Sequence, residues 1–233
     1  MSLFLGVDLT SAAKTPTAYA LLDERLEIQT LDFFREDAEL VGKANEHQPS
    51  LIGIDAPLSL PLGWHCLENP CSCNACLSPT LDKTRTAEVE LSARRIPFYW
   101  TTRRSIIKKM VYRAISLRSA LESRGHHVIE VFPYATKMRL WGRQMPKKNT
   151  PEGVTFLRQK LELLLPNLGQ RWSDLDHDRA DALMATYTVW LHHRGQTESL
   201  GIAAEGQIVI PREGLAPSLR VSGNIAPENQ QHT

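Results

Sequence analysis

The 233-residue sequence lacks several features that would place it in a broad class at once. No apolar run approaches the ~20 residues that a membrane-spanning helix needs, so we expect no membrane partner. The amino-terminal segment reaches Asp8 without a basic leader, which predicts a cytoplasmic protein with no signal peptide. The formal net charge is only +1. Any affinity for nucleic acid must therefore come from local clustering of charge.

Cysteines are few and are confined to one short segment. Cys66, Cys71, Cys73 and Cys76 follow the pattern Cys-x4-Cys-x-Cys-x2-Cys, whereas a disulfide framework would connect distant parts of the chain. Four thiolates on one loop can surround a tetrahedral zinc ion, which then has no open position for water. The Cys-x-Cys step is less usual for zinc, so an iron–sulfur cluster is the alternative, and thiols without a metal are a third interpretation of the pattern. We expect residues 62–80 to be a metal-binding insertion that shapes the substrate site.

The spacing of apolar residues predicts an α/β fold in one domain, residues 1–211. Three short apolar segments between Leu3 and Phe34 lie close enough in sequence to form a three-strand antiparallel meander. Further strands and helices then alternate, which indicates a mixed sheet flanked by helices. Large apolar residues become sparse over residues 212–233, which predicts a disordered tail. The later strands are expected at Leu51–Asp55, His126–Phe132 and Gly206–Ile210, and the helices at Asp37–His47, Thr86–Arg95, Arg103–Arg124, Thr150–Leu165 and Asp176–His193.

Acidic side chains interrupt or end apolar strands at Asp8, Asp55 and Glu130. Asp178 and Asp181 lie three residues apart on a predicted helix and so occupy neighbouring positions on its surface. Any one of these acids alone would be a common turn or cap residue. Carboxylates that gather in an apolar setting are costly unless a cation neutralises them. We therefore expect the five to form a catalytic site for Mg²⁺ or Mn²⁺, where two ions would stabilise the attacking and leaving oxygens of a phosphoryl displacement.

Four motifs occur in a characteristic order: Gly6–Asp8, Ile54–Pro57, Glu130–Pro133 and His177–Leu183. Together they resemble the domain-of-unknown-function family 429 (DUF429), whose members are predicted RNase-H-like nucleases. The last motif also resembles the closing acidic helix of Holliday-junction resolvases. The resemblance implies an RNase-H-like sheet. It also implies metal-binding acids at Asp8, at Asp55 and at Asp181 with Asp178, whereas Glu130 matches a motif without an assigned role.

Basic residues gather between Arg94 and Arg124, where nine arginines and lysines accompany a single acid, Glu122. Three aromatic residues, 98–100, lie among them. Such a segment suits contacts to phosphates and stacking on bases, although a solvated helix face has a similar composition. The residues expected to contact nucleic acid are Arg103, Arg104, Lys108, Lys109 and Arg113.

These observations predict a metal-dependent nuclease that hydrolyses phosphodiester bonds in DNA or RNA. The alternative is a non-catalytic nucleic-acid or protein adaptor with a structural metal knuckle, in which Asp8 and Asp181 would be buried structural groups. An adaptor gains nothing from clustered acids, which favours the nuclease. The choice between DNA and RNA and the oligomeric state are left open at this point.

Overall fold

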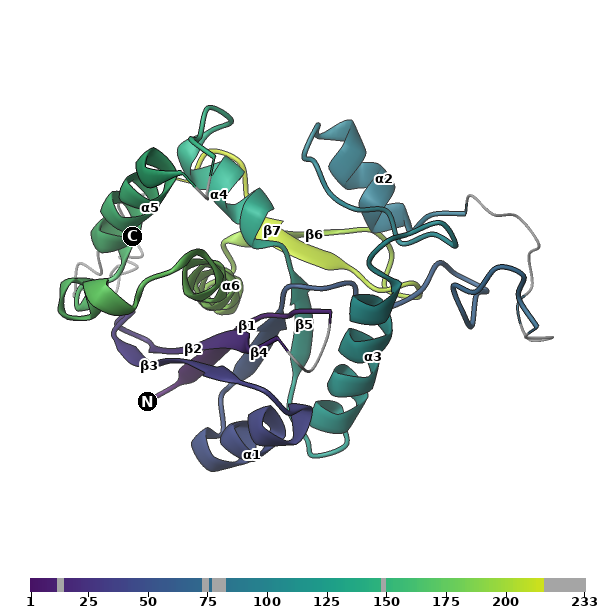
Figure 1. Cartoon of the computed structure of the whole chain (residues 1–233), viewed down its shortest axis with the longest axis horizontal. Helices are drawn as coiled ribbons and strands as arrows, with labels where there is room; N and C mark the ends of the chain where they lie inside the picture. The colour runs from purple at the N-terminus through teal and green to yellow at the C-terminus, as the bar shows by residue number, and fades with distance from the viewer. Residues whose placement is uncertain (12–14, 73–75, 77–82, 148–149, 216–233) are drawn as a thin grey trace, which may run out of the picture.

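The computed structural model describes residues 1–11, 15–72, 76, 83–147 and 150–215. These residues form a seven-stranded sheet in the order β3-β2-β1-β4-β5-β7-β6 (Figure 1). Strands β1, β2 and β3 make the predicted antiparallel meander, whereas β4 and β5 run parallel to β1. The strands are β1 (Leu3–Asp8), β2 (Thr17–Asp23), β3 (Ile28–Phe34), β4 (Leu51–Ile54), β5 (Val128–Val131), β6 (Thr197–Leu200) and β7 (Ile208–Pro211).

Helices cover both faces of this sheet, so the predicted mixed sheet flanked by helices is confirmed. Helix α6 lies on one face with α4 and α5, and α1 and α3 lie on the other (Figure 1). Each face has its own apolar core, one built around α6 and one around α1 and α3. The meander followed by parallel strands is the RNase-H-like arrangement that the resemblance implies. The helices are α1 (Asp37–His47), α2 (Thr86–Ala93), α3 (Lys108–Glu122), α4 (Pro133–Trp141), α5 (Pro151–Leu164) and α6 (His177–His193), with a 3₁₀ helix η1 (Leu168–Asp174).

Two helices differ from the sequence prediction. Helix α3 begins at Lys108 rather than Arg103, because residues 102–107 form turns. Helix α4 was not predicted: the expected strand ends at Phe132, and Pro133, the next residue, is the first residue of this helix. Proline is well suited to that position, since the first helical N–H has no intrahelical partner. Strand β6 was missed as well, because its sequence, Thr-Glu-Ser-Leu, is short and polar.

Helix α6 packs directly onto the middle of the sheet. A Cβ atom on Gly6 of β1 would overlap the backbone nitrogen of Thr186 and would lie 2.7 Å from the carbonyl oxygen of Ala182. A Cβ atom on Gly53 of β4 would overlap the side chain of Val189 in the same helix. The two glycines therefore let the helix backbone approach the sheet closely.

Parts of the predicted insertion and tail lie outside the described residues, namely 73–75, 77–82 and 216–233. The first residues after β7 are held: the backbone N–H of Arg212 donates to the carbonyl of Gln196 at 3.1 Å. No helix in the described ranges is long and apolar enough to cross a membrane.

We predict that Gly6→Ala lowers the free energy of unfolding by about 3 kcal/mol, because the new methyl group would push α6 away from the sheet. The matched control is Gly42→Ala in α1, where an added Cβ meets no atom within 4 Å. This control should raise stability by roughly 0.5–1 kcal/mol, since alanine favours the helix. Urea unfolding measures both variants. A Gly6→Ala protein as stable as the wild type would contradict the close packing.

Candidate functional site

The alternation of side chains along β1 and β4 directs two of the predicted aspartates toward α6. Gly6 and Gly53 face that helix. Because successive strand residues point to opposite faces, Asp8 and Asp55, each two residues further on, point to the same side. The two acids are neighbours, since the backbone N–H of Asp55 donates to the carbonyl of Val7 at 2.9 Å. Parallel strands β1 and β4 thus end with paired carboxylates at one edge.

Asp181 completes this group from the other side. It lies in the first turns of α6, next to Ala182, whose carbonyl packs against Gly6. Asp8, Asp55 and Asp181 all line one cavity of about 550 Å³. The structure therefore brings together three acids that are 47 and 126 residues apart in sequence, at the place where the strands meet the start of the helix.

Sequence reasoning missed a fourth charged member of this cavity, Lys137 of α4. Its ammonium group lies 2.5 Å from Oδ1 of Asp181, and the side chains are only 5% and 9% exposed. A nearly buried ion pair is rare, because both groups lose their hydration. The signal that could have found it is Pro133, which starts the helix and places Lys137 one turn into it.

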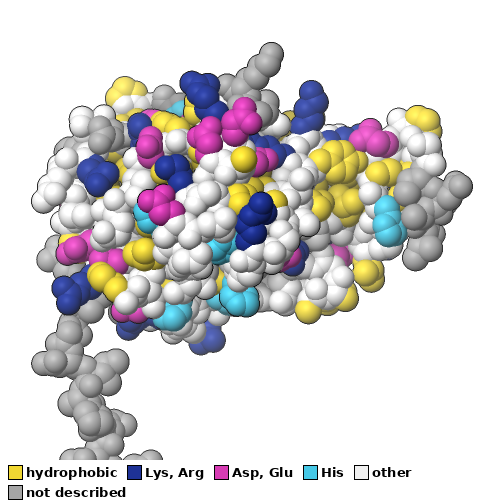
Figure 2. Space-filling view, turned by 90° about the horizontal axis from the view of Figure 1, so that it is seen from below, with side chains coloured by type: hydrophobic (Ala, Val, Ile, Leu, Met, Phe, Trp, Pro, Cys, Tyr) yellow, Lys and Arg dark blue, Asp and Glu magenta, His cyan; other side chains and the backbone are white. Residues whose placement is uncertain are grey.

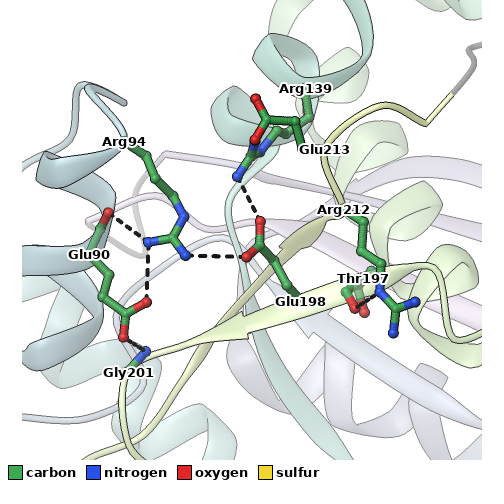
Figure 3. A network of polar contacts seen from close by, with 8 residues as sticks. All are labelled: Glu90, Arg94, Arg139, Thr197, Glu198, Gly201, Arg212 and Glu213. Atoms are coloured by element: carbon green, nitrogen blue, oxygen red, sulfur yellow. Dashed lines mark hydrogen bonds and ion pairs between the residues drawn. The ribbon is translucent and has the colours of Figure 1, made fainter.

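The outer side of α4 is anchored by a network of ion pairs (Figure 3). Glu198 of β6 accepts from Arg139 of α4 at 2.6 Å and from Arg94, just after α2, at 3.3 Å. Arg139 also pairs with Glu213 at 3.1 Å. Single exposed pairs contribute little, but a network that joins several elements restricts their relative movement. The helix that carries Lys137 is therefore tied to the edge of the sheet.

Asp178 takes a different position from Asp181. It is absent from the described lining of the aspartate cavity. Its side chain is 35% exposed, and Oδ1 lies 3.1 Å from the ring of His177. The structure thus places Asp178 on the exposed start of α6, and its predicted catalytic role stays a prediction.

Glu130 lies on β5 in a buried ion pair and is absent from the described lining of the aspartate cavity. Both of its oxygens accept from the guanidinium of Arg85 at 2.8 Å, and one also accepts from the backbone N–H of Leu58 at 2.9 Å. Its neighbour Val131 belongs to the core on the α6 face, so Glu130 points to the opposite face. Its predicted catalytic role stays a prediction, and its contacts are those of a structural pair.

Two further buried acids surround Arg85, and sequence reasoning missed all three residues. Burial raises the pKa of Glu88, against the hydrogen bonds from Thr101 and the charge of Arg85 that lower it. Burial also acts on Glu205, but N–H groups of Leu62 and Thr86 outweigh it and lower the pKa of that carboxyl. Asp55, Glu88 and Glu130 line a small apolar hollow beside the aspartate cavity. The cluster thus lies next to Asp55 and outside the aspartate cavity.

The five predicted nucleic-acid contacts divide into two groups. Arg103 is 6% exposed, with its guanidinium 4.7 Å from the ring centre of Trp64. Arg113 pairs with Asp37 at 2.7 Å. Both therefore make internal contacts. Lys108 is half-buried, and the exposed members are Arg104 and Lys109. On the side of the molecule that Figure 2 shows, basic and acidic side chains of the described residues are interspersed.

Three of the four cysteines converge. The Sγ atom of Cys66 lies 3.1 Å from that of Cys71 and 4.0 Å from that of Cys76. The Sγ atoms of Cys71 and Cys76 are 3.5 Å apart, so all three lie within 4.8 Å of one another. Around a zinc ion with bonds near 2.3 Å, sulfurs would be about 3.8 Å apart, so the spacing fits one metal. A backbone N–H from His65 lowers the pKa of Cys76 to about 6, which favours the thiolate that metals bind. Cys73 lies outside the described residues.

Comparison with known proteins now gives the family. A family model described as "Protein of unknown function (DUF429)" matches residues 6–205. The chain belongs to DUF429. The matched range contains all the predicted carboxylates and cysteines, and membership confirms the resemblance that the four motifs carried.

Two of the solved structures that match this chain are structures of RuvC. RuvC from Thermus thermophilus in complex with a Holliday junction substrate is 11% identical; the match covers 84% of this chain and 97% of RuvC, with a TM-score of 0.45. Another structure of Thermus thermophilus RuvC is 11% identical over 83% of this chain and 96% of RuvC, with a TM-score of 0.46. No curated protein matches the sequence. Similarities at this level carry no argument about activity.

We predict that Glu130→Gln lowers the free energy of unfolding by about 3 kcal/mol, because the buried guanidinium of Arg85 would lose the charge of its direct hydrogen-bonding partner. The control is Glu198→Gln, which weakens a partly exposed network (Figure 3) and should cost less than about 1 kcal/mol. Chemical unfolding compares the two variants. If Glu130→Gln were as stable as the wild type yet bound Mn²⁺ less tightly, Glu130 would be a metal ligand and not a structural partner.

Proposed function

We propose that this protein is a metal-dependent nuclease that hydrolyses phosphodiester bonds in DNA or RNA. The observation that carries the proposal is the convergence of Asp8, Asp55 and Asp181 in one cavity. Side chains from two strand ends and a helix are brought to one place, although nothing in the core requires charge there. A set of carboxylate oxygens is the donor set that Mg²⁺ and Mn²⁺ prefer. The family and the RNase-H-like sheet agree with this chemistry.

The three aspartates would hold the divalent ion, each from a rigid element. When bound, the ion supplies an activated water and stabilises charge on the scissile phosphate. Asp8 and Asp55 are fixed by the ladder between β1 and β4. Asp181 is fixed by the packing of α6 and by Lys137. Rigid placement of this kind limits the reorganisation that catalysis would otherwise require.

The substrate strand would approach over the rim of the cavity. Tyr99 and Tyr134 line the cavity and are 66% and 39% exposed, so each offers a ring on which a base can stack. Lys147 also lines the cavity and is exposed. Together with Arg104 and Lys109 it offers a positive charge to the phosphate backbone.

We predict that Asp8→Asn and Asp181→Asn abolish cleavage while the wild type cleaves in Mg²⁺ or Mn²⁺. Either change removes a negative ligand from the ion. Asp181→Asn also leaves the buried ammonium group of Lys137 without its partner, so this variant should be the less stable of the two. The assay offers single-stranded, duplex and branched DNA and RNA with labelled ends, and it includes a reaction with chelator. Thermal unfolding of each variant establishes that the fold is intact. Full activity in both variants would end the proposal, and metal-independent binding without cleavage would favour the adaptor.

We further propose that Cys66, Cys71, Cys73 and Cys76 hold one structural metal ion, with zinc as the first candidate and an iron–sulfur cluster as the alternative. The convergence of three thiols on one loop supports this. Metal binding would add order to the part of the loop that carries the cysteines. Because four thiolates leave no position for water, this metal would shape the site and take no part in hydrolysis.

We predict about one zinc per chain in anaerobically purified protein, because the thiol spacing fits a single ion. Elemental analysis gives the content, and the absorbance spectrum distinguishes zinc, which is colourless, from an iron–sulfur cluster. Cys66→Ser should lower the content several-fold, whereas Asp8→Asn should leave it unchanged. Full metal content in Cys66→Ser would show that the ion is bound elsewhere.

A further inference from the structure

We propose that the carboxylate site binds a single divalent ion, and that the ammonium group of Lys137 takes the place of a second ion. The inference rests on the proposed nuclease function and names a catalytic residue within it. Lys137 lies at the same cavity as Asp8, Asp55 and Asp181. It differs from a typical surface lysine because it is 4% exposed and is held 2.5 Å from Asp181.

The charges of the cavity support one ion rather than two. Asp8, Asp55 and Asp181 carry three negative charges, and the buried Lys137 carries one positive charge. Lys147 also lines the cavity, but it is exposed, so solvent and salt screen its charge. One divalent ion brings this group to neutrality, whereas a second would leave an excess of two positive charges in a cavity that is partly shielded from water. Uncompensated charge is costly in such surroundings. Glu130 does not change the balance, because Arg85 neutralises it.

Geometry also limits a second ion. Lys137 donates to Oδ1 of Asp181, so Asp181 shares its charge between the ammonium group and any ion. Helix α4 cannot easily withdraw the lysine, because Arg139 and Glu198 tie that helix to β6 (Figure 3). A second ion would have to displace a cation that the fold holds in place.

The role of Lys137 follows from where negative charge develops during phosphodiester hydrolysis. Water adds to phosphorus and gives a proton to the solvent; the bond from phosphorus to the leaving sugar oxygen breaks, and that oxygen takes a proton from the solvent. Lys137 neither gains nor loses a proton. Its fixed positive charge stabilises the negative charge that builds on the phosphate or the leaving oxygen, as a metal ion does in a two-metal site.

The first test measures metal stoichiometry and does not depend on activity. The full chain, with its cysteine metal in place, is titrated with Mn²⁺ by calorimetry and by electron paramagnetic resonance. We expect one Mn²⁺ per chain, with the spectrum of an isolated ion. Two exchange-coupled ions in the wild type would overturn the role of Lys137 and leave the nuclease proposal standing. No bound ion would instead end the metal-dependent nuclease itself.

Variants then test the lysine directly. Lys137→Met keeps the length of the side chain and removes the charge, so the cavity should bind a second Mn²⁺. Lys137→Arg keeps the charge and should bind one. Lys147→Met, which removes an exposed lysine from the same cavity, should also bind one. An unchanged single Mn²⁺ in folded Lys137→Met would contradict the inference.

Cleavage gives an independent measurement. Lys137→Met should lower kcat by about 10²–10³-fold with a smaller change in KM, because the lost contact forms mainly in the transition state. Thermal unfolding shows whether this variant folds. If Lys137→Met does not fold, the number of Mn²⁺ ions bound by the wild type and by Lys137→Arg still tests the inference. A kcat for Lys137→Met equal to that of the wild type would show that the lysine only packs against Asp181.

Discussion

The close packing of α6 against β1 and β4 is the constraint on which the rest of the site depends. At Gly6 and Gly53 any larger side chain would collide with the helix. The helix therefore lies directly over the ends of the two strands, and the alternation of side chains sends Asp8 and Asp55 toward the side of the helix that carries Asp181. The glycines contribute no chemistry themselves. They determine how near the carboxylates come to one another, and so whether the group can hold a metal ion.

The two buried ion pairs, Arg85–Glu130 and Lys137–Asp181, have different surroundings. Arg85 and Glu130 satisfy each other on the face away from α6, with a further N–H from Leu58. The Arg85–Glu130 pair is buried, and it holds the loop after β4 against β5. Lys137 and Asp181 form a pair that opens onto a cavity with two more acids. Because a buried pair is a weak source of stability, the second pair is better explained by the chemistry it makes available than by the fold it supports.

The sequence allowed much of this arrangement to be predicted, and the failures have physical causes. The meander, the mixed sheet flanked by helices and the start of α6 follow from local patterns, and the acids at the strand ends were evident as charges in apolar segments. Glu130 showed the same pattern, but whether a strand residue faces one side or the other depends on its partner strands, and one residue of offset changes the face. Lys137 was missed because Pro133 both ends β5 and begins α4. The basic segment was overinterpreted where Arg103 and Arg113 make contacts inside the fold, which charge composition alone does not reveal.

The cysteine loop is connected to the cavity through α3. Trp64 and Leu67 of the loop pack against Val111 of that helix, and the hydroxyl of Tyr112 accepts from the backbone N–H of Leu67 at 2.6 Å. Arg103 stacks over Trp64 just before the helix begins. The loop and α3 are thus packed together, and Met110 of α3 lines the aspartate cavity. Order imposed on the loop by a metal would therefore extend to the rim over which a substrate strand would pass.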